Sequence, residues 1–280
     1  METDELQAAR IIEANHRVHA REASIYDRVH PEIFGAFEQK CIRSDLEIVY
    51  SLFEHQPLRV MDLGCGTGNL ALKFLEAGHF VRAVDLSGEM LSVLETKIQD
   101  TWKGRIELVQ GDALQELESG EIEPEWDVIS FSSVLHHLPD YYSVLRCAFD
   151  LIGPGGALYV CHEPLAAPDE VQSRLSHAIA GLMRLVDNFY IRAVKVHVYA
   201  WERITAGRKF RRMDYSLADY HLPAGISMTE ILHLLEAKGA RKVAARTYHA
   251  YFLDTLRALD DHLGITAPTG FTCIVQKPVN

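Results

Sequence analysis

Short apolar runs alternate with amphipathic segments through the middle of the chain. Five runs of strand length read RVMDL, FVRAVDLS, RIELVQGD, WDVISFSS and ALYVCHE, and most of the segments between them have helical spacing. Two more strands are expected at 241–252 and 271–278, with a helix at 253–264 between them. Apolar strands that alternate with helices are typical of a mostly parallel sheet covered on both faces. The pattern therefore predicts an α/β fold with seven strands.

Two stretches depart from this rhythm. Residues 4–23, and the segment that begins at Pro31, have helical spacing ahead of the first strand. Residues 165–225 contain no clear strand and are rich in His, Tyr and Arg, which indicates a mostly helical insertion after the fifth strand. Ser227 and Glu230 then form a capping-box pattern at the start of another helix. Four parts are expected, at 1–56, 57–164, 165–225 and 226–280.

The overall charge and the cysteines exclude several classes of protein. The formal net charge is −11, which argues against a protein that binds nucleic acid mainly through phosphates. The five cysteines are scattered, without CxxC or zinc spacing, so we expect reduced thiols and no metal site. The acidic N-terminus is unlike a secretory signal, and no apolar run reaches the ~20 residues of a transmembrane helix. We therefore expect a cytoplasmic protein without a transmembrane segment.

The glycine-rich stretch VMDLGCGTGNL lies between the first strand and the helix that follows it. Its glycines, Gly64, Gly66 and Gly68, let the backbone turn tightly or approach a ligand closely. Such a loop, followed by a helix N-terminus, suits a nucleotide cofactor. A P-loop is excluded because no Lys-Ser or Lys-Thr follows the glycines. Asn69 stands where the GxGxxG pattern of a dinucleotide site would have its third glycine.

The stretch DLGCGTGN resembles the first motif of class I S-adenosylmethionine (SAM)-dependent methyltransferases. The segments QGDAL, SFSSVLHHLPD and LIGPGGALYV are similar to later motifs, so the resemblance covers roughly residues 59–163. It is closest to small-molecule methyltransferases of the ubiquinone/menaquinone-biosynthesis type. The resemblance implies a Rossmann-like SAM-binding core, with residues 1–56 as a helical lid and 165–225 as a substrate cap. Two alternatives stay open: a SAM-binding protein that transfers no methyl group, and an NAD-dependent dehydrogenase.

The resemblance also implies the residues that hold SAM. Asp85 would accept the ribose hydroxyls, Asp112 the adenine amino group, and Asp62 the methionine amino group. Each has a plain structural alternative, because Asp62 could cap the loop and Asp112 could belong to a turn. Tyr26 would either close over the sulfonium or pack between helices. The full set expected at the cofactor is Tyr26, Asp62, Gly64, Cys65, Gly66, Asp85, Leu86, Met90, Asp112, Ala113, Ser132 and Ser133.

Methyl transfer needs the reacting atoms held in line, and an oxygen or nitrogen acceptor often needs a base. His136 and His137 follow the fourth strand, where the methyl group should point, and Glu163 ends the fifth. We take all three as candidate catalytic residues. The sequence does not distinguish the two histidines, and either could instead shape the pocket. The acceptor is expected to be a small molecule, methylated at oxygen in preference to nitrogen or carbon.

The segment at 165–225 gives two further indications about the acceptor. Its aromatic residues suggest an apolar or ring-containing molecule, although each could be ordinary packing. They are His177, Phe189, Tyr190, His197, Tyr199, Trp201, Tyr215, Tyr220 and His221. The basic cluster Arg208, Lys209, Arg211 and Arg212 could meet an acidic acceptor or form a solvated helix face. The oligomeric state stays open, with a homodimer among the options.

Overall fold

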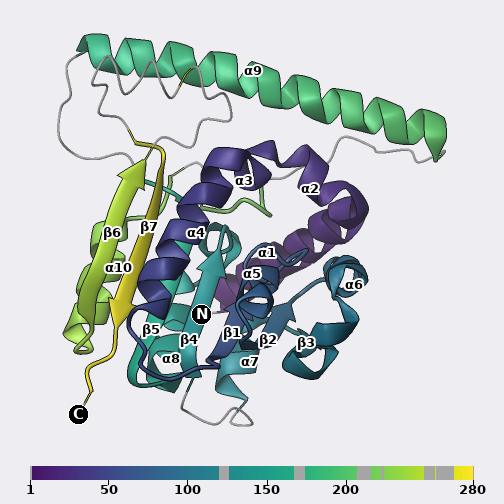
Figure 1. Cartoon of the computed structure of the whole chain (residues 1–280). Helices are drawn as coiled ribbons and strands as arrows, with labels where there is room; N and C mark the ends of the chain where they lie inside the picture. Colours follow the sequence, from purple (N-terminus) through teal and green to yellow (C-terminus); the bar gives the residue numbers. More distant parts are fainter. Residues whose placement is uncertain are drawn as a thin grey trace.

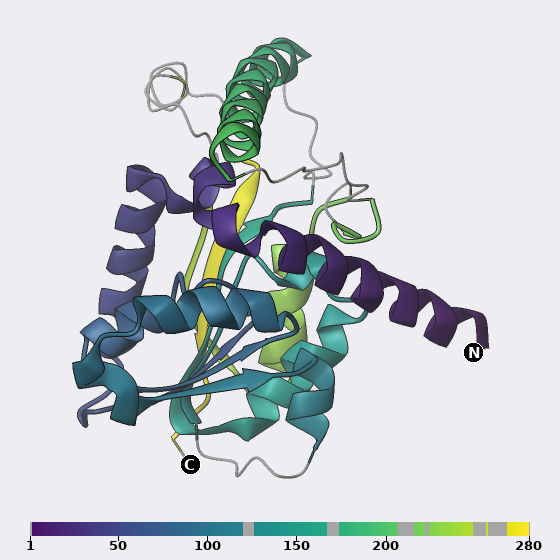
Figure 2. The same ribbon diagram turned by 90° about the vertical axis from the view of Figure 1, so that its right-hand side faces the viewer.

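A seven-stranded sheet runs through the centre of the molecule, with helices on both faces (Figure 1, Figure 2). The computed structural model describes residues 2–119, 126–166, 174–206, 216–221, 224–248, 256 and 268–279. The strands are β1 (Arg59–Leu63), β2 (Phe80–Asp85), β3 (Ile106–Gln110), β4 (Trp126–Ser132), β5 (Ile152–Pro164), β6 (Arg241–Tyr248) and β7 (Gly270–Gln276).

The strand order is β3-β2-β1-β4-β5-β7-β6. β7 is antiparallel to both of its neighbours, and the other neighbouring pairs are parallel. The strand order reverses between β1 and β4, and open α/β sheets bind ligands outside the strand ends at such a switch point. The predicted α/β fold with seven mostly parallel strands is confirmed.

Each face of the sheet buries its own apolar cluster. Phe74 and Tyr159 belong to one cluster, and Phe131 and Phe149 to the other. The first face is covered by α4 (Ala36–Tyr50), α5 (Ala71–Glu76) and α6 (Gly88–Lys97), and the second by α7 (Ala113–Glu118), α8 (Tyr141–Leu151) and α10 (Met228–Ala237). Burial on both faces explains why the strands appear in the sequence as continuous apolar runs.

Four of these helices begin at a side-chain cap. Ser87, Asp112, Asp140 and Ser227 accept hydrogen bonds from backbone N–H groups in the first turn of α6, α7, α8 and α10. The cap at Ser227 was expected from the sequence. Helix α7 was not, because its six residues are too few for a clear periodic pattern. The helix expected at 88–102 ends at Lys97 and is followed by a 3₁₀ helix, Asp100–Arg105.

The N-terminal helices lie over the carboxyl edge of the sheet (Figure 1). Helix α1 (Glu2–Glu22) leads through a short 3₁₀ turn into α2 (Tyr26–Val29) and α3 (Pro31–Phe34). The continuous helix expected after Pro31 is interrupted at Gly35, whose ψ of 153° is extended. Glycine favours this break because it gains little from the helical state.

Helix α9 (Arg174–Thr205) lies across the top of the molecule in Figure 1. Val198 packs with Ile25 and Val29, and Arg28 forms an ion pair of 2.6 Å with Glu202. Among the described residues no helix, α9 included, is long and apolar enough to cross a membrane. Apart from Leu256, the helix expected at 253–264 lies outside the described residues, as does the basic cluster at 208–212.

Candidate functional site

The loop after β1 turns sharply at the carboxyl edge of the sheet. The N–H groups of Gly64 and Cys65 donate to the carbonyl of Val84 on β2, at 2.9 and 3.0 Å. Gly64 and Gly66 have left-handed φ values of +68° and +52°. A Cβ on Gly64 would lie 2.2 Å from Cγ2 of Val134, whereas a Cβ on Gly66 would meet nothing within 4 Å. Gly64 is therefore required for packing, and Gly66 presents its backbone to open space.

That open space is a cavity, here called the first cavity. Its walls come from the loops after β1, β2, β3 and β4 and from the N-terminal helices. All of the residues expected at a cofactor line it: Tyr26, Asp62, Gly64, Cys65, Gly66, Asp85, Leu86, Met90, Asp112, Ala113, Ser132 and Ser133. The fold thus brings the whole set to one place, while the role of each residue stays a prediction.

Two buried carboxylates anchor this cavity. Asp62 accepts hydrogen bonds from Ser130 Oγ at 2.8 Å and from a backbone N–H of α5 at 3.1 Å. Asp85 accepts from the N–H groups of Gly66 and Ser87, at 2.7 and 2.9 Å. Burial raises the pKa of Asp62 to about 7 and that of Asp85 to about 6, because the charged forms lose hydration. Each carboxylate oxygen can accept two hydrogen bonds, so Asp85 keeps capacity for the hydroxyls of a ligand.

Two other residues of the first cavity have clear structural roles. Oδ1 of Asp112 accepts from the N–H groups of Leu114 and Gln115, both at 3.1 Å, and so caps α7. These bonds use one oxygen, which leaves the second oxygen for a ligand. Burial, with Asp85 nearby, raises the pKa of the Cys65 thiol well above its usual range. Cys65 is thus a small packing residue and not a nucleophile.

Helix α1 supplies a wall of the first cavity that the sequence analysis missed. The residues are Ile12, Asn15, His16 and His19, whose spacing places them on one face of the helix. Asn15 donates through Nδ2 to the carbonyls of Ile11 and His137, at 3.1 and 2.9 Å. Its Oδ1 is buried without a hydrogen-bond partner, so it can accept from a polar ligand. The spacing was visible in the sequence, but no motif linked this helix to a cofactor.

A polar link ties the N-terminal segment to the glycine loop. Asp27 accepts from Thr67 Oγ1 and from Lys97 Nζ, both at 2.5 Å. The neighbouring Tyr26 ring lies against His30 and Phe34, with ring centroids 4.3 and 6.2 Å apart. These contacts hold Tyr26 at the edge of the first cavity.

A second cavity of about 450 Å³ adjoins the first. The two share His19, Tyr26, Ile33, Ser133 and His137. The remaining lining is Glu22, His30, Glu32, His136, His162, Glu163, Pro164, Lys195, Asp219, Tyr248, Thr269 and Gly270. Its volume suits a small molecule, and its walls are rich in ionisable side chains.

Glu163 supports the loop after β4 and the imidazole of His136. One oxygen accepts from the N–H groups of Val134 and Leu135, at 2.6 and 2.8 Å. The other lies 2.8 Å from Nδ1 of His136. A bulge in the β5–β7 pairing, with a left-handed φ of +54° at His162, aims Glu163 into the interior. With a carboxylate accepting at Nδ1, Nε2 is the nitrogen of His136 that can take up a proton.

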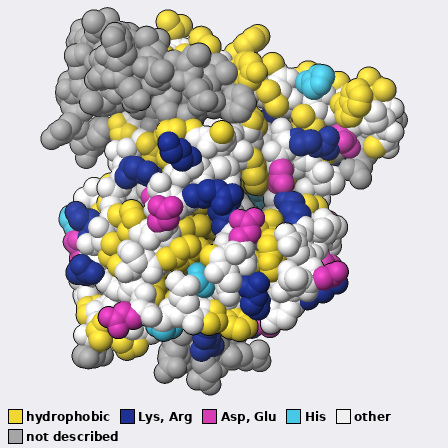
Figure 3. Space-filling view, in the orientation of Figure 1, with side chains coloured by type: hydrophobic (Ala, Val, Ile, Leu, Met, Phe, Trp, Pro, Cys, Tyr) yellow, Lys and Arg dark blue, Asp and Glu magenta, His cyan; other side chains and the backbone are white. Residues whose placement is uncertain are grey.

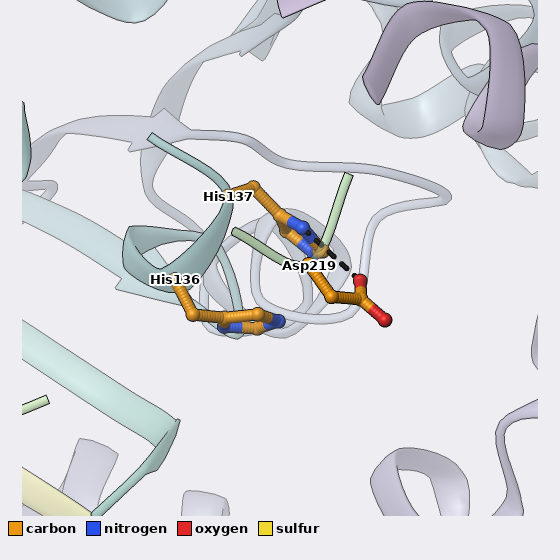
Figure 4. A group of neighbouring side chains, drawn as sticks. All are labelled: His136, His137 and Asp219. Atoms are coloured by element: carbon orange, nitrogen blue, oxygen red, sulfur yellow. Dashed lines mark ion pairs between the residues drawn. The ribbon is translucent and has the colours of Figure 1, made fainter. Parts of the chain in front are cut away.

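His137 has a different environment (Figure 4). Its Nδ1 lies 2.7 Å from the carbonyl oxygen of Ala218 and 3.5 Å from Oδ1 of Asp219. Burial lowers the pKa of His137 well below its ordinary value, and the nearby His136 and His19 add to this. The structure thus separates the two histidines: His137, whose pKa is lowered, lines both cavities, whereas His136 lines the second and is hydrogen-bonded to a carboxylate.

Three side chains, His136, His137 and Asp219, lie close enough together to be candidate metal ligands. Their ligand atoms lie within 4.8 Å of one another (Figure 4). The carbonyl of Ala218, however, already occupies Nδ1 of His137, the atom nearest Asp219. This geometry fits hydrogen bonding better than metal coordination, and the expected absence of a metal stays a prediction.

Paired charges line the other side of the second cavity. Nδ1 of His162 lies 3.1 Å from Oε1 of Glu38, which also accepts from the Tyr248 hydroxyl at 3.0 Å. Burial alone would lower the pKa of His162, but its contact with Glu38 raises it above the ordinary value. The pKa of His30 is raised in the same way, against burial, by two neighbouring glutamates. The raised pKa values therefore favour the protonated forms of His162 and His30.

The aromatic wall expected from residues 165–225 is not found among the described residues of the second cavity. Lys195 and Asp219 are the residues from that stretch that line it. Phe189 and Trp201 are 75% and 56% exposed, on the outer side of α9. The hydroxyl of Tyr199 donates to Glu22. The side chains of His177 and Tyr215 lie outside the described residues.

Comparison with known proteins identifies the central segment. Residues 61–158 match the family model described as a methyltransferase domain. Over 120 residues the chain is 31% identical to the ubiquinone biosynthesis O-methyltransferase of Xanthomonas axonopodis pv. citri (strain 306), covering 41% of this chain and 47% of that protein. Over 126 residues it is 35% identical to the tRNA 5-carboxymethoxyuridine methyltransferase of Escherichia coli (strain K12), covering 44% and 47%. The chain spans about half the length of these curated relatives.

A solved structure extends the likeness to nearly the whole chain. It is the magnesium protoporphyrin IX methyltransferase (ChlM) from Synechocystis PCC 6803 with bound SAM. The TM-score is 0.55 at 14% sequence identity, with 94% of this chain and 97% of that chain covered. At this identity the likeness shows the fold.

Proposed function

Because residues 61–158 form a class I SAM-dependent methyltransferase domain, we propose that the protein methylates a small molecule, at an oxygen atom. SAM is the cofactor of this domain. The observation that carries the proposal is the pair of adjoining cavities, one lined by the SAM motifs and the other by His136 and Glu163.

The donor set of the first cavity fits SAM. The open face of Gly66 gives a ligand access to the backbone, and Asp85 beside it is assigned to the ribose hydroxyls. Asp112 is assigned to the adenine amino group and Asp62 to the amino group of the methionine part. Bound SAM supplies a methyl group that its sulfonium has already activated, so the protein's part is to hold the acceptor in line and exclude water.

His136 is assigned as the base that takes the proton from the acceptor. Glu163 fixes the ring through Nδ1, which leaves Nε2 to face the second cavity. Ser133 and His137 line both cavities and so mark where the two molecules would meet. Glu163 itself is assigned as a positioning residue, because its oxygens already accept hydrogen bonds from the loop and from His136.

The second cavity favours a polar acceptor. Lys195 offers positive charge, and so does His30, whose pKa is raised. Asp219 and Glu32 offer negative charge. One relative is a tRNA methyltransferase by name, but the net charge of −11 favours a small acceptor over a polyanion. In this arrangement residues 1–56 act as a lid on SAM, and residues 165–225 cap the acceptor.

The first test is cofactor binding. Calorimetry of the full chain is expected to show micromolar-range binding of SAM and S-adenosylhomocysteine and none of NAD. Mass spectrometry of the purified protein is expected to find copurified SAM or its product. If SAM does not bind, the cofactor assignment fails together with the methyltransferase proposal.

The second test is turnover across a panel of hydroxylated, amino and tRNA acceptors. His136→Gln is expected to lower turnover about a hundredfold while SAM affinity stays within twofold. His233→Gln serves as the matched control, because His233 is an exposed histidine on α10. SAM binding without turnover on any acceptor would favour the alternative, a protein that holds SAM but transfers no methyl group.

A further inference from the structure

Helix α9 turns its apolar side away from the rest of the molecule. Leu185, Phe189 and Ile204 are 67%, 75% and 80% exposed. Exposed apolar side chains lie three residues apart or adjacent between Leu182 and Phe189, and then recur after about two turns at Val196 and Ile204. Together they define the α9 stripe: Leu182, Leu185, Val186, Phe189, Val196 and Ile204. From Leu182 to Ile204 the stripe runs about 33 Å along the helix. In Figure 3, hydrophobic side chains gather along the top of the molecule, where this helix lies.

The inner side of the same helix mixes apolar and polar residues and is anchored to the body. Met183, Asp187, Val198 and Glu202 are buried against the body. Glu202 forms its ion pair with Arg28, and Lys195 lines the second cavity. A helix on a globular protein normally buries its large apolar side chains, whereas α9 also carries a set of them on its outer side. An apolar surface of this length on the outside requires an occupant.

The charges beside the stripe are basic. Arg192 lies two turns beyond Leu185 and Arg203 two turns beyond Val196, so both flank the stripe, and both are exposed. The acidic residues of the described helix, Asp187 and Glu202, are buried on the opposite side. An exposed apolar stripe with basic residues at its margin has the composition of a helix that lies in the plane of a membrane interface.

We propose that the α9 stripe docks on a lipid bilayer that contains anionic phospholipids. The stripe would enter the boundary between headgroups and acyl chains, and Arg192 and Arg203 would meet lipid phosphates. The net charge of −11 does not prevent this, because salt screens charges more than about 10 Å from the contact. Such a surface contact needs no membrane-spanning segment.

Charge complementarity favours lipid over a second copy of the chain. In a two-fold pairing of α9 helices along their stripes, the basic margins of both copies would lie near the same seam. Like charges at that spacing repel, and the exposed margin has no acid of its own to offset them. The proposal does not depend on methyl transfer, because membrane docking is measured without turnover.

The test is flotation of the full chain with vesicles. One set contains phosphatidylcholine alone, and the other phosphatidylcholine mixed with phosphatidylglycerol. Binding is expected to the mixed vesicles and to weaken with added salt. Phe189→Ser with Val196→Ser is expected to weaken binding about tenfold or more. Arg192→Gln and Arg203→Gln are each expected to weaken it about fivefold.

Matched controls distinguish docking through the α9 stripe from nonspecific adsorption to the vesicles. Leu6→Ser and Val279→Ser remove apolar side chains that are as exposed as the stripe, 65% and 79%, but lie on other elements. Both are expected to bind vesicles as the unchanged protein does, and all variants are expected to keep their SAM affinity. Vesicle binding that the Phe189→Ser and Val196→Ser pair leaves unchanged would overturn the proposal. So would a dimer in light scattering that this pair dissociates, with no vesicle binding.

Discussion

The first cavity is lined mainly by the ends of consecutive strands, whereas the second is assembled from side chains far apart in the chain. Around the first, most of the hydrogen bonds involve backbone groups of the glycine loop and two carboxylates at strand ends. Around the second, side chains are held by other side chains, as Glu163 holds His136 and Glu38 holds His162. The difference indicates that the lining of the first cavity follows mainly from the strand order, whereas the lining of the second depends on contacts between core strands, the N-terminal helices and two residues of 165–225.

The largest expected effect comes from the glycine loop. Gly64→Ala should lower the free energy of unfolding by about 3 kcal/mol, because its φ is left-handed and its Cβ would overlap Val134. Gly66→Ala should cost only about 1 kcal/mol, because its Cβ meets open space, yet it should weaken SAM binding. Chemical denaturation and calorimetry measure the two effects. Equal destabilisation by both substitutions would contradict the different roles of the two glycines.

The next effect concerns SAM binding and the loop around it. Asp85→Ala should weaken SAM binding about a hundredfold, because it removes the carboxylate assigned to the ribose hydroxyls and the acceptor for the Gly66 and Ser87 N–H groups. Titration calorimetry measures it, and Asp100→Ala is the control because that side chain is 94% exposed. Unchanged SAM affinity in the Asp85 variant would remove the ribose assignment.

A third substitution tests the second cavity without touching the first. In Glu163→Gln the amide oxygen can still accept from the loop, but its NH₂ group cannot accept from Nδ1 of His136. Turnover should fall about thirtyfold with SAM affinity unchanged, because His136 loses the carboxylate that orients its ring. A loss of SAM affinity equal to the loss of turnover would mean that Glu163 serves only the fold.

The smallest effect is a pH dependence of SAM binding. Asp62 must be ionised to bind an ammonium group, and its pKa is raised by burial to about 7. SAM affinity should therefore rise about tenfold between pH 5.5 and 7.5. Proton release on binding should appear as a calorimetric binding enthalpy that changes with the ionisation enthalpy of the buffer.

The stability of the ligand-free protein should follow the opposite trend. The raised pKa of Asp62 contributes stability that is fully present below its unfolded value of 3.8 and is lost as pH rises through about 7. Thermal unfolding without and with SAM checks both trends. An SAM affinity that stays constant over this pH range would contradict the contact with Asp62.

The sheet and the lining of the first cavity were predictable because their signals are local. Each strand is a short apolar run, and the expected cofactor residues lie near strand ends: Asp85 is the last residue of β2, and Asp112 follows β3 by two residues. The parallel order then brings these strand ends to one edge without further information. Helix α7 was missed because six residues carry too little periodicity.

The second cavity was less predictable because its pairs join distant segments. Nothing in the sequence near His162 indicates that Glu38 will lie against it, or that Ala218 will meet His137. The distinction between His136 and His137 depends on these partners, so the sequence left it open. The aromatic wall is not found among the described residues for a related reason: composition showed that 165–225 contains aromatic residues, but not which side of α9 they would occupy.

The place of β7 in the sheet also has a consequence for synthesis on the ribosome. β7 pairs with β5 on one side and β6 on the other, although both are made before it. Until residues 270–276 emerge, β5 has an open edge and β6 has no strand to pair with. The nascent chain therefore carries an open edge on β5 from about residue 164 until β7 emerges, the condition under which strands of separate chains associate.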